Sequence, residues 1–304
     1  LVKCVRQIIP TQTISIRVHG PLKEDIMAEY ALSMDGRTAY MEMAAASGLT
    51  LVPQDRRNPM VTTTYGVGEM IADAVRRGCK TIIMGLGGSA TCDGGRGMIM
   101  ALRDNDYLNP DCDVIAACDV SNPLFGRNGA AYIFAPQKGA TPEQVALLDN
   151  HLRTFARETE LAGFASPSLA DYPGAGAAGG LGYALLAYLK AELHSGIDIM
   201  LDLANFDEAI KDADLVVTGE GKSDEQTLMG KVPHGVLRRC KKLGVPVWLL
   251  SGSIEDTSGI LTKSFDFIRS INDGDNRPIS VLLQADVAKE NLTKTMKNLI
   301  IKRQ

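Results

Sequence analysis

The chain has 304 residues, of which 45% are hydrophobic and 22% are charged, and its formal net charge is -4. This composition is typical of a globular protein with a sizeable core and excludes a disordered chain. It offers no broad basic field for nucleic acid or a membrane surface, and aromatic residues, at 5%, are too few for base-stacking platforms. The six cysteines contain no Cys-x-x-Cys pair, which favours reduced thiols in a cytoplasmic protein over a disulfide framework or a zinc site.

The first predicted elements form an antiparallel meander. Residues 14–45 contain Gly-Pro and Asp-Gly turn signals between short runs of alternating polarity. Further along the chain, runs rich in β-branched residues predict strands at 38–44, 80–86, 113–120, 214–220, 245–252 and 265–271. Helical patterns lie between several of them, at 66–77, 141–160, 180–193, 232–243 and 281–301. Strands that alternate with helices indicate an α/β fold with parallel sheets covered on both faces.

Three glycine-rich loops stand out at 85–97, 173–182 and 217–235, two of them directly after predicted strands. A strand, a glycine loop and a helix in this order can present backbone N–H groups to phosphate, helped by the helix dipole. The glycines at 173–182 have an alternative role, because they also permit tight packing of a helix on a sheet.

Standard nucleotide-binding motifs fit these loops poorly. The loop at 85–97 contains a loose dinucleotide-binding fingerprint, Gly-Leu-Gly-Gly-Ser-Ala, with Asp104 further along, but more glycines stand where its helix should begin. Residues 219–223 read GEGKS and resemble the end of a Walker A loop, but Val216 replaces the earlier glycine that this motif requires. An NAD(P)-dependent oxidoreductase stays open as an alternative.

Longer motifs form a more specific pattern over nearly the whole chain. They read GGSATCDGG at 87–95, ACDVSNPLFGRNGA at 117–130, FAPQKGAT at 134–141, PGAGAAGGLG at 173–182 and VTGEGKSDEQTLMGKVPHGV at 217–236. In wording and order these motifs resemble the bacterial class I glycerate kinases.

The resemblance implies a kinase that phosphorylates D-glycerate with ATP and Mg²⁺, with 2-phosphoglycerate favoured as the product. It implies a flavodoxin-like parallel-sheet domain formed by residues 1–10 and 210–304. Residues 11–209 would form a second, inserted α/β domain with a mixed sheet. The expected partner is the small-molecule substrate, not nucleic acid or a membrane, and the resemblance admits a homo-oligomer.

The sequence departs from this family at several points. An Asp-Ser-x-Lys motif and an Ala-Asp-Gly-Gly-Glu-Gly motif are absent, and residues 1–10, which resemble the family's first helix, run into a segment that resembles its later meander. Residues 101–104 lead into 105–114 where the family has a longer glycine-rich excursion. Lys222 stands where Arg is usual, which keeps the charge but not the bidentate fork. These departures keep open a catalytically inactive sugar-acid-binding protein of the same fold.

Acidic residues near strand ends are the candidate metal and base groups. Phosphoryl transfer needs carboxylates for the metal and a group that positions the acceptor hydroxyl, and α/β folds place such sites at the carboxyl ends of strands. We predict Asp93, Asp119 and Glu220 as metal ligands. Either Asp119 or Asp224 is predicted to orient or deprotonate the glycerate hydroxyl. Each of these acids has a structural alternative, as a helix cap or a turn former.

The candidate cations are Lys231 and Lys222, one of which is predicted to neutralise the glycerate carboxylate or the developing charge. Lys138, within PQKGAT, is equally well interpreted as a solvated charge or as a carboxylate anchor. The predicted catalytic residues are Asp119, Asp224 and Lys231. The predicted nucleotide-binding residues are Gly87, Gly88, Ser89, Asp93, Gly176, Gly179, Gly180, Glu220, Lys222 and Gln226.

Overall fold

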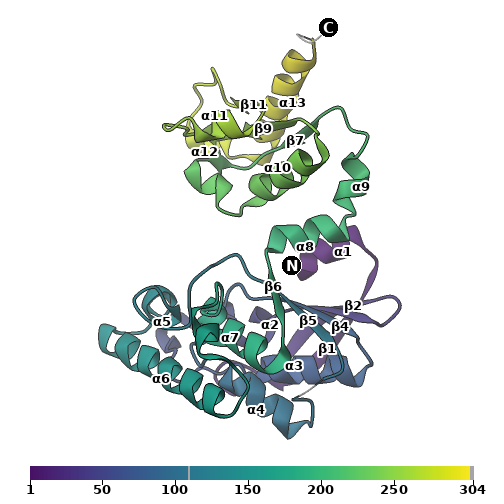
Figure 1. Ribbon diagram of the computed structural model, residues 1–304. Coiled ribbons are helices and arrows are strands. Elements are labelled where there is room, and N and C mark those ends of the chain that lie inside the picture. The colour runs from purple at the N-terminus through teal and green to yellow at the C-terminus, as the bar shows by residue number, and fades with distance from the viewer. Residues whose placement is uncertain (109, 302–304) are drawn as a thin grey trace. The chain divides into compact units, whose positions relative to one another are not determined.

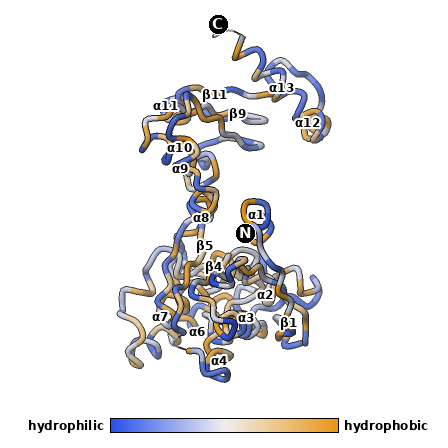
Figure 2. The backbone as a smooth tube through the Cα atoms, turned by 90° about the vertical axis from the view of Figure 1, so that its right-hand side faces the viewer, coloured by the Kyte–Doolittle hydropathy of each residue, from blue (hydrophilic) through white to orange (hydrophobic). Residues whose placement is uncertain are grey.

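The computed structural model describes residues 1–108 and 110–301. Asn109 lies outside the described residues. Residues 302–304, the last three of the domain predicted to include 210–304, also lie outside them. The chain divides into two compact units, Leu1–Ile199 and Met200–Gln304. The helix α8 (Gly196–Leu203) carries the chain from the first unit into the second (Figure 2).

The first unit is built on a six-stranded mixed sheet in the order β1-β2-β3-β4-β5-β6 (Figure 1). The first three strands pair antiparallel, as predicted for the meander, and β3 to β6 pair parallel. The strands are β1 (Thr11–His19), β2 (Asp25–Ser33), β3 (Thr38–Glu42), β4 (Thr81–Gly85), β5 (Asp113–Ala117) and β6 (Glu192–His194). Gly36, with φ +71°, supplies the left-handed residue that the β2–β3 turn needs.

Helices cover this sheet on both faces, with α3 and α4 on one and α1 on the other (Figure 1). The α-helices are α1 (Val2–Ile8), α2 (Ala44–Ser47), α3 (Tyr65–Arg76), α4 (Arg96–Asp104), α5 (Ala130–Phe134), α6 (Pro142–Leu161) and α7 (Ala177–Leu189). Short 3-10 helices are η1 (Leu49–Leu51), η2 (Gln54–Arg56), η3 (Pro136–Lys138) and η4 (Pro167–Asp171). The predicted helices at 66–77, 141–160 and 180–193 correspond to α3, α6 and α7.

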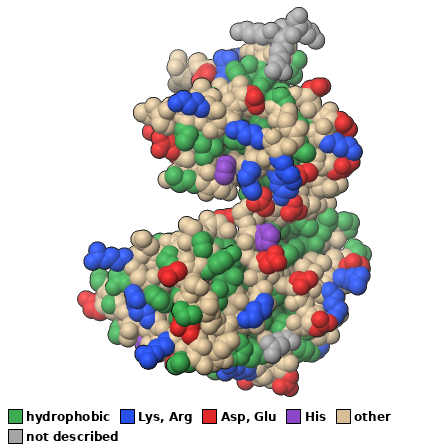
Figure 3. Space-filling model, viewed as in Figure 1, with side chains coloured by type: hydrophobic (Ala, Val, Ile, Leu, Met, Phe, Trp, Pro, Cys, Tyr) green, Lys and Arg blue, Asp and Glu red, His purple; other side chains and the backbone are tan. Residues whose placement is uncertain are grey.

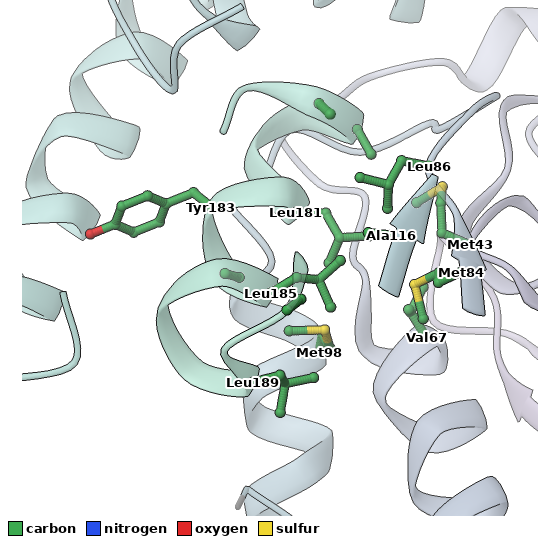
Figure 4. Close-up of a cluster of buried hydrophobic side chains, with 14 of the residues drawn as sticks. Met43, Val67, Met84, Leu86, Met98, Ala116, Leu181, Tyr183, Leu185 and Leu189 are labelled. Carbon is green, nitrogen blue, oxygen red and sulfur yellow. The ribbon is translucent and has the colours of Figure 1, made fainter. Parts of the chain in front are cut away.

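The core of the first unit lies between the sheet and the helices α3, α4 and α7. Leu181 and Leu185 of α7 face Ala116 of β5, whereas Tyr183 points to the opposite side of the helix (Figure 4). The Tyr183 hydroxyl donates to the carbonyl oxygen of Ala156 in α6 at 3.4 Å. Thus α7 is buried on two sides, which explains why its sequence is apolar around most of its circumference.

The second unit contains a three-stranded parallel sheet in the order β11-β9-β7 and a two-stranded parallel ladder of β10 and β8. Its strands are β7 (Val216–Thr218), β8 (Lys222–Ser223), β9 (Val247–Ser251), β10 (Ser253–Ile254) and β11 (Phe267–Ser270). Its helices after α8 are α9 (Phe206–Ile210), η5 (Glu225–Leu228), α10 (Val232–Leu243), α11 (Ile260–Ser264), α12 (Ile279–Leu282) and α13 (Ala285–Ile301). The α/β fold with a mixed sheet and a separate parallel sheet is confirmed.

The division of the chain differs from the prediction at two points. Residues 1–10 were predicted to join residues 210–304, but they belong to the first unit, where α1 packs against β2 and β3. Val2 and Val5 are buried there. The boundary between the units also falls inside α8 and not at residue 210.

The surface charges are mixed in sign. On the face that Figure 3 shows, acidic and basic side chains are interspersed and do not form separate fields. Within the described ranges, no helix combines the length and the apolar character that a membrane crossing requires.

Candidate active site

A cavity of about 440 Å³ lies at the carboxyl ends of β4 and β5 in the first unit. We call it the β4–β5 cavity. Its walls include Gly87, Gly88, Ser89, Asp119, Lys138 and Ala178. The structure therefore brings together the glycine loop after β4, the predicted acid after β5 and the lysine of the PQKGAT motif, as expected for neighbouring parallel strands.

The glycine loop is fixed in place by the segment at 47–49. The backbone N–H of Leu49 donates to the Gly88 carbonyl oxygen, and that of Ala90 donates to Ser47, both at 2.8 Å. A methyl group added at Gly87 would meet no atom within 4 Å, so packing does not require glycine there. The bare backbone instead leaves this part of the cavity open to a ligand.

Asp119 stands at the edge of the cavity just beyond β5. Its Oδ1 accepts a hydrogen bond from the backbone N–H of Gly196 at 2.8 Å, and the residue is exposed. Burial raises the pKa of the adjacent Cys118 thiol. A carboxylate that is oriented by one backbone donor and still open to solvent can interact with a substrate hydroxyl or a metal.

Lys138 is absent from the predicted catalytic and nucleotide-binding sets, but it lines this cavity and is only 3% exposed. Its Nζ donates to Ser89 Oγ and to the Thr91 carbonyl oxygen, each at 2.7 Å. Burial lowers its pKa to about 8, while the Cys92 thiol and the Asp93 carboxylate act in the opposite direction. The sequence signal was the lysine inside a long motif, but the sequence could not show that the side chain is buried.

Asp93 lies outside the β4–β5 cavity and its carboxylate is fully engaged. Oδ2 accepts from the backbone N–H and hydroxyl of Thr64, at 2.9 and 2.8 Å, and from the Gly97 N–H at 3.2 Å. Oδ1 accepts from the Gly95 N–H at 3.0 Å. Asp93 thus satisfies backbone donors where both α3 and α4 begin, which favours the capping alternative over the predicted metal role.

The glycines at 173–182 have packing roles. A methyl group at Gly176 would lie 2.2 Å from the Pro123 carbonyl oxygen, and one at Gly179 would lie 2.0 Å from that of Thr91. Gly179 and Gly180 also have positive φ angles, +70° and +92°. Close backbone contacts therefore account for these glycines without a nucleotide. Ala178 shares the left-handed conformation, with φ 51°, and it borders the cavity.

In the second unit, the loop after β7 gathers three predicted residues. Lys231 Nζ lies 3.6 Å from Asp224 Oδ1 and 3.9 Å from Glu220 Oε2. Two carboxylates around one half-exposed lysine form a polar cluster at the carboxyl end of a parallel strand.

Two hydroxyl groups that were not among the predicted site residues hold this cluster in place. Glu220 Oε1 accepts from Thr227 Oγ1 at 2.6 Å and from Ser223 Oγ at 3.0 Å. Both hydroxyl residues are fully buried. Asp224 caps η5 through the Gln226 N–H. One oxygen of Glu220 is therefore fixed by the fold, and the other faces Lys231.

Lys222 and Gln226 are placed less favourably for ligand binding in this conformation. Lys222 Nζ forms an exposed ion pair with Glu255 Oε2 at 2.6 Å, and this hydrogen bond raises the pKa of Lys222. The Gln226 side chain is exposed, and its backbone N–H serves the η5 cap.

The chain is similar to known proteins over most of its length. The model of the Glycerate kinase family matches residues 1–105 and 103–303. A glycerate kinase of Bacillus cereus (strain ATCC 10987) is 43% identical, covering 94% of this chain and 81% of the relative. The glycerate 2-kinase of Escherichia coli K12 is 46% identical, covering 80% of this chain and 71% of the relative.

The chain belongs to the glycerate kinase family. It is therefore a kinase. A crystal structure assigned as a glycerate kinase 2, from Salmonella typhimurium LT2, superposes with a TM-score of 0.78 at 36% identity and covers 98% of this chain and 86% of its own. The two segments matched by the family model meet at residues 103–105, where the sequence departs from the family's longer excursion.

Membership of the glycerate kinase family, and the geometry after β4, both exclude the oxidoreductase alternative. A dinucleotide-binding fingerprint needs its glycines to open the following helix, but α4 begins only at Arg96. Asp104, the expected ribose ligand, lies at the far end of that helix and accepts from the Tyr65 hydroxyl at 2.7 Å.

The predicted acidic residues differ in how well they fit a divalent cation such as Mg²⁺. No cluster of three or more metal-ligating side chains is present among residues 1–108 and 110–301. Mg²⁺ needs none, because one or two carboxylates and substrate phosphates suffice. Glu220, Asp224 and Asp119 each keep an oxygen free of backbone donors and fit this requirement, whereas Asp93 does not.

Proposed function

We propose that this chain transfers the γ-phosphoryl group of ATP to D-glycerate and forms 2-phosphoglycerate. The observation that carries the proposal is its similarity to glycerate kinases of two bacteria along most of its length, at 43% and 46% identity. The name of the Escherichia coli relative, glycerate 2-kinase, supports the 2-hydroxyl group as the acceptor.

The first unit supplies groups for the acceptor and for phosphate. The backbone of Gly87 and Gly88 approaches the β4–β5 cavity without side chains and can donate N–H groups to the single phosphoryl group that is transferred to the acceptor. Asp119 orients the attacking hydroxyl and accepts its proton. The carboxylate suits this role because its single backbone hydrogen bond fixes its direction and leaves it accessible.

The second unit supplies charges for phosphoryl transfer. Glu220 and Asp224 would hold Mg²⁺, which neutralises phosphate charge when it is bound. Lys231, between these two acids, stabilises negative charge on the transferred group. Lys222 would contribute only if its ion pair with Glu255 opens.

The test is an ADP-release assay with full-length chain, ATP and a panel of small hydroxy acids, with ³¹P NMR identifying the product. Turnover with D-glycerate and a 2-phosphoglycerate resonance are the expected results. Glycerate binding without ADP release would instead support an inactive binding protein of this fold. Six free cysteines and the need for ATP are consistent with the cytoplasm as the site of action.

A further inference from the structure

The β4–β5 cavity contains a buried positive charge without a carboxylate partner. Among the described residues no acidic side chain forms an ion pair with Lys138, and both of its hydrogen-bond acceptors, Ser89 Oγ and the Thr91 carbonyl oxygen, are neutral. An ammonium group has three N–H donors, of which these acceptors use two. Removing a charge from water is costly when no opposite charge lies in contact with it, and the Asp93 carboxylate offsets this cost only in part, so a fold rarely keeps such a lysine for packing alone.

The position of Lys138 points to a ligand in the cavity. The side chain is 3% exposed to solvent and lines the cavity beside Ser89. The Ser89 oxygen accepts from Lys138, so the hydroxyl hydrogen of Ser89 remains available to donate elsewhere. An ammonium hydrogen and a hydroxyl hydrogen from adjacent groups form a pair of donors suited to one carboxylate.

The charge balance of the cavity selects a small monoanion. The charged side chains that line it are Lys138 and Asp119, one of each sign. The remaining walls are largely apolar, with Leu49, Leu86 and Phe134 among them. A triphosphate, with several negative charges, would face one lysine and one repelling acid there. A hydroxy acid instead offers one carboxylate for the lysine and hydroxyl groups for Asp119.

We infer that the β4–β5 cavity is the carboxylate subsite for D-glycerate, with Lys138 as its anchor and Ser89 as the second donor. The inference rests on the proposed function, because D-glycerate is the acid it names. It assigns the substrate carboxylate to Lys138, which the sequence had left open as a solvated charge or a carboxylate anchor, and not to Lys231 or Lys222.

The first experiment measures D-glycerate binding to the full chain by calorimetry without nucleotide. Lys138→Met keeps the length of the side chain and removes its charge, and we expect it to weaken binding by about 10- to 100-fold. Ser89→Ala should weaken binding by about tenfold. Lys190→Met is the matched control, because Lys190 Nζ also donates to backbone carbonyls, of Phe164 and Ala187, but is not part of the cavity wall.

The pH dependence of binding separates a charge role from a structural one. Burial lowers the pKa of Lys138 to about 8, and a carboxylate binds only the protonated form. The dissociation constant for D-glycerate should therefore rise about tenfold per pH unit above this value, and Lys138→Met should lose this rise. The charged groups facing Lys138 are Asp93 and, across the cavity, Asp119. Burial raises the pKa of the Cys92 thiol to about 11 and also raises the pKa of the Cys118 thiol.

Steady-state kinetics decide between the remaining outcomes. A higher KM for D-glycerate in Lys138→Met, with the KM for ATP within about threefold, supports the inference. A raised KM for ATP alone would overturn it and assign the lysine to phosphate. Normal glycerate kinetics in Lys138→Met would overturn it while leaving the proposed function intact. An unmodified chain that neither binds nor phosphorylates D-glycerate would overturn both.

Discussion

Two glycines that look alike in the sequence have different roles at the residue scale. Gly87→Ala should leave the free energy of unfolding within about 0.5 kcal/mol, because the added methyl group meets no atom within 4 Å. Gly179→Ala should cost about 2 kcal/mol or more, because its φ is +70° and the methyl group would lie 2.0 Å from the Thr91 carbonyl oxygen. Urea denaturation followed by circular dichroism measures both.

Activity completes this comparison. Gly87→Ala places a methyl group inside the β4–β5 cavity, so we expect kcat/KM to fall by about tenfold in a protein of normal stability. A variant with full activity would show that no ligand approaches this part of the loop.

The acids Asp119 and Asp224 can be tested with little disturbance of the fold. In each, an Asn Oδ1 can still accept the existing backbone hydrogen bond, from Gly196 or from Gln226. Asp119→Asn and Asp224→Asn therefore remove charge alone, and turnover with D-glycerate should fall by about 10²-fold or more, because base and metal roles need the carboxylate. Near-normal rates in both variants would refute the assignment.

At the scale of elements, the Asp93 carboxylate accepts hydrogen bonds from residues at the beginning of both α3 and α4. Asp93→Asn replaces one acceptor oxygen with an amide that faces backbone donors, so we expect a loss of about 2–4 kcal/mol in the free energy of unfolding. Asp119→Asn is the matched control and should lose almost none. An Asp93→Asn protein of unchanged stability that lacked only activity would favour the metal role predicted from the sequence.

Elements themselves were largely predictable because their causes are local. The β-branched runs at 80–86 and 113–120 became β4 and β5, and the Asp-Gly signal marked the β2–β3 turn. The two-residue strands β8 and β10 were not predicted, because a pair of residues carries no periodic signal and becomes a ladder only through its partner.

For the whole molecule, the division into two compact units predicts that each unit unfolds in a thermal transition of its own. The single tryptophan, Trp248, is buried in β9 of the second unit, so its fluorescence reports that unit, while most long helices lie in the first. Asp93→Asn should lower the thermal transition seen by circular dichroism and leave the fluorescence transition within about 1 °C. Equal shifts of both signals would show that the units unfold together.

The sequence alone determined the family, the α/β class and the stretches that carry the chemistry, because long motifs and hydrophobic periodicity are written in consecutive residues. Only the tertiary structure decided which polar groups bind ligands and which serve the fold. Asp93 and Lys138 both sit in family motifs. Four hydrogen-bond donors surround the Asp93 carboxylate, whereas the Lys138 ammonium contacts only two neutral acceptors among the described residues. Ser89 and Lys138 are far apart in the chain. The cost of a charge depends on its burial, and Lys138 becomes buried beside Ser89 only when the chain has folded.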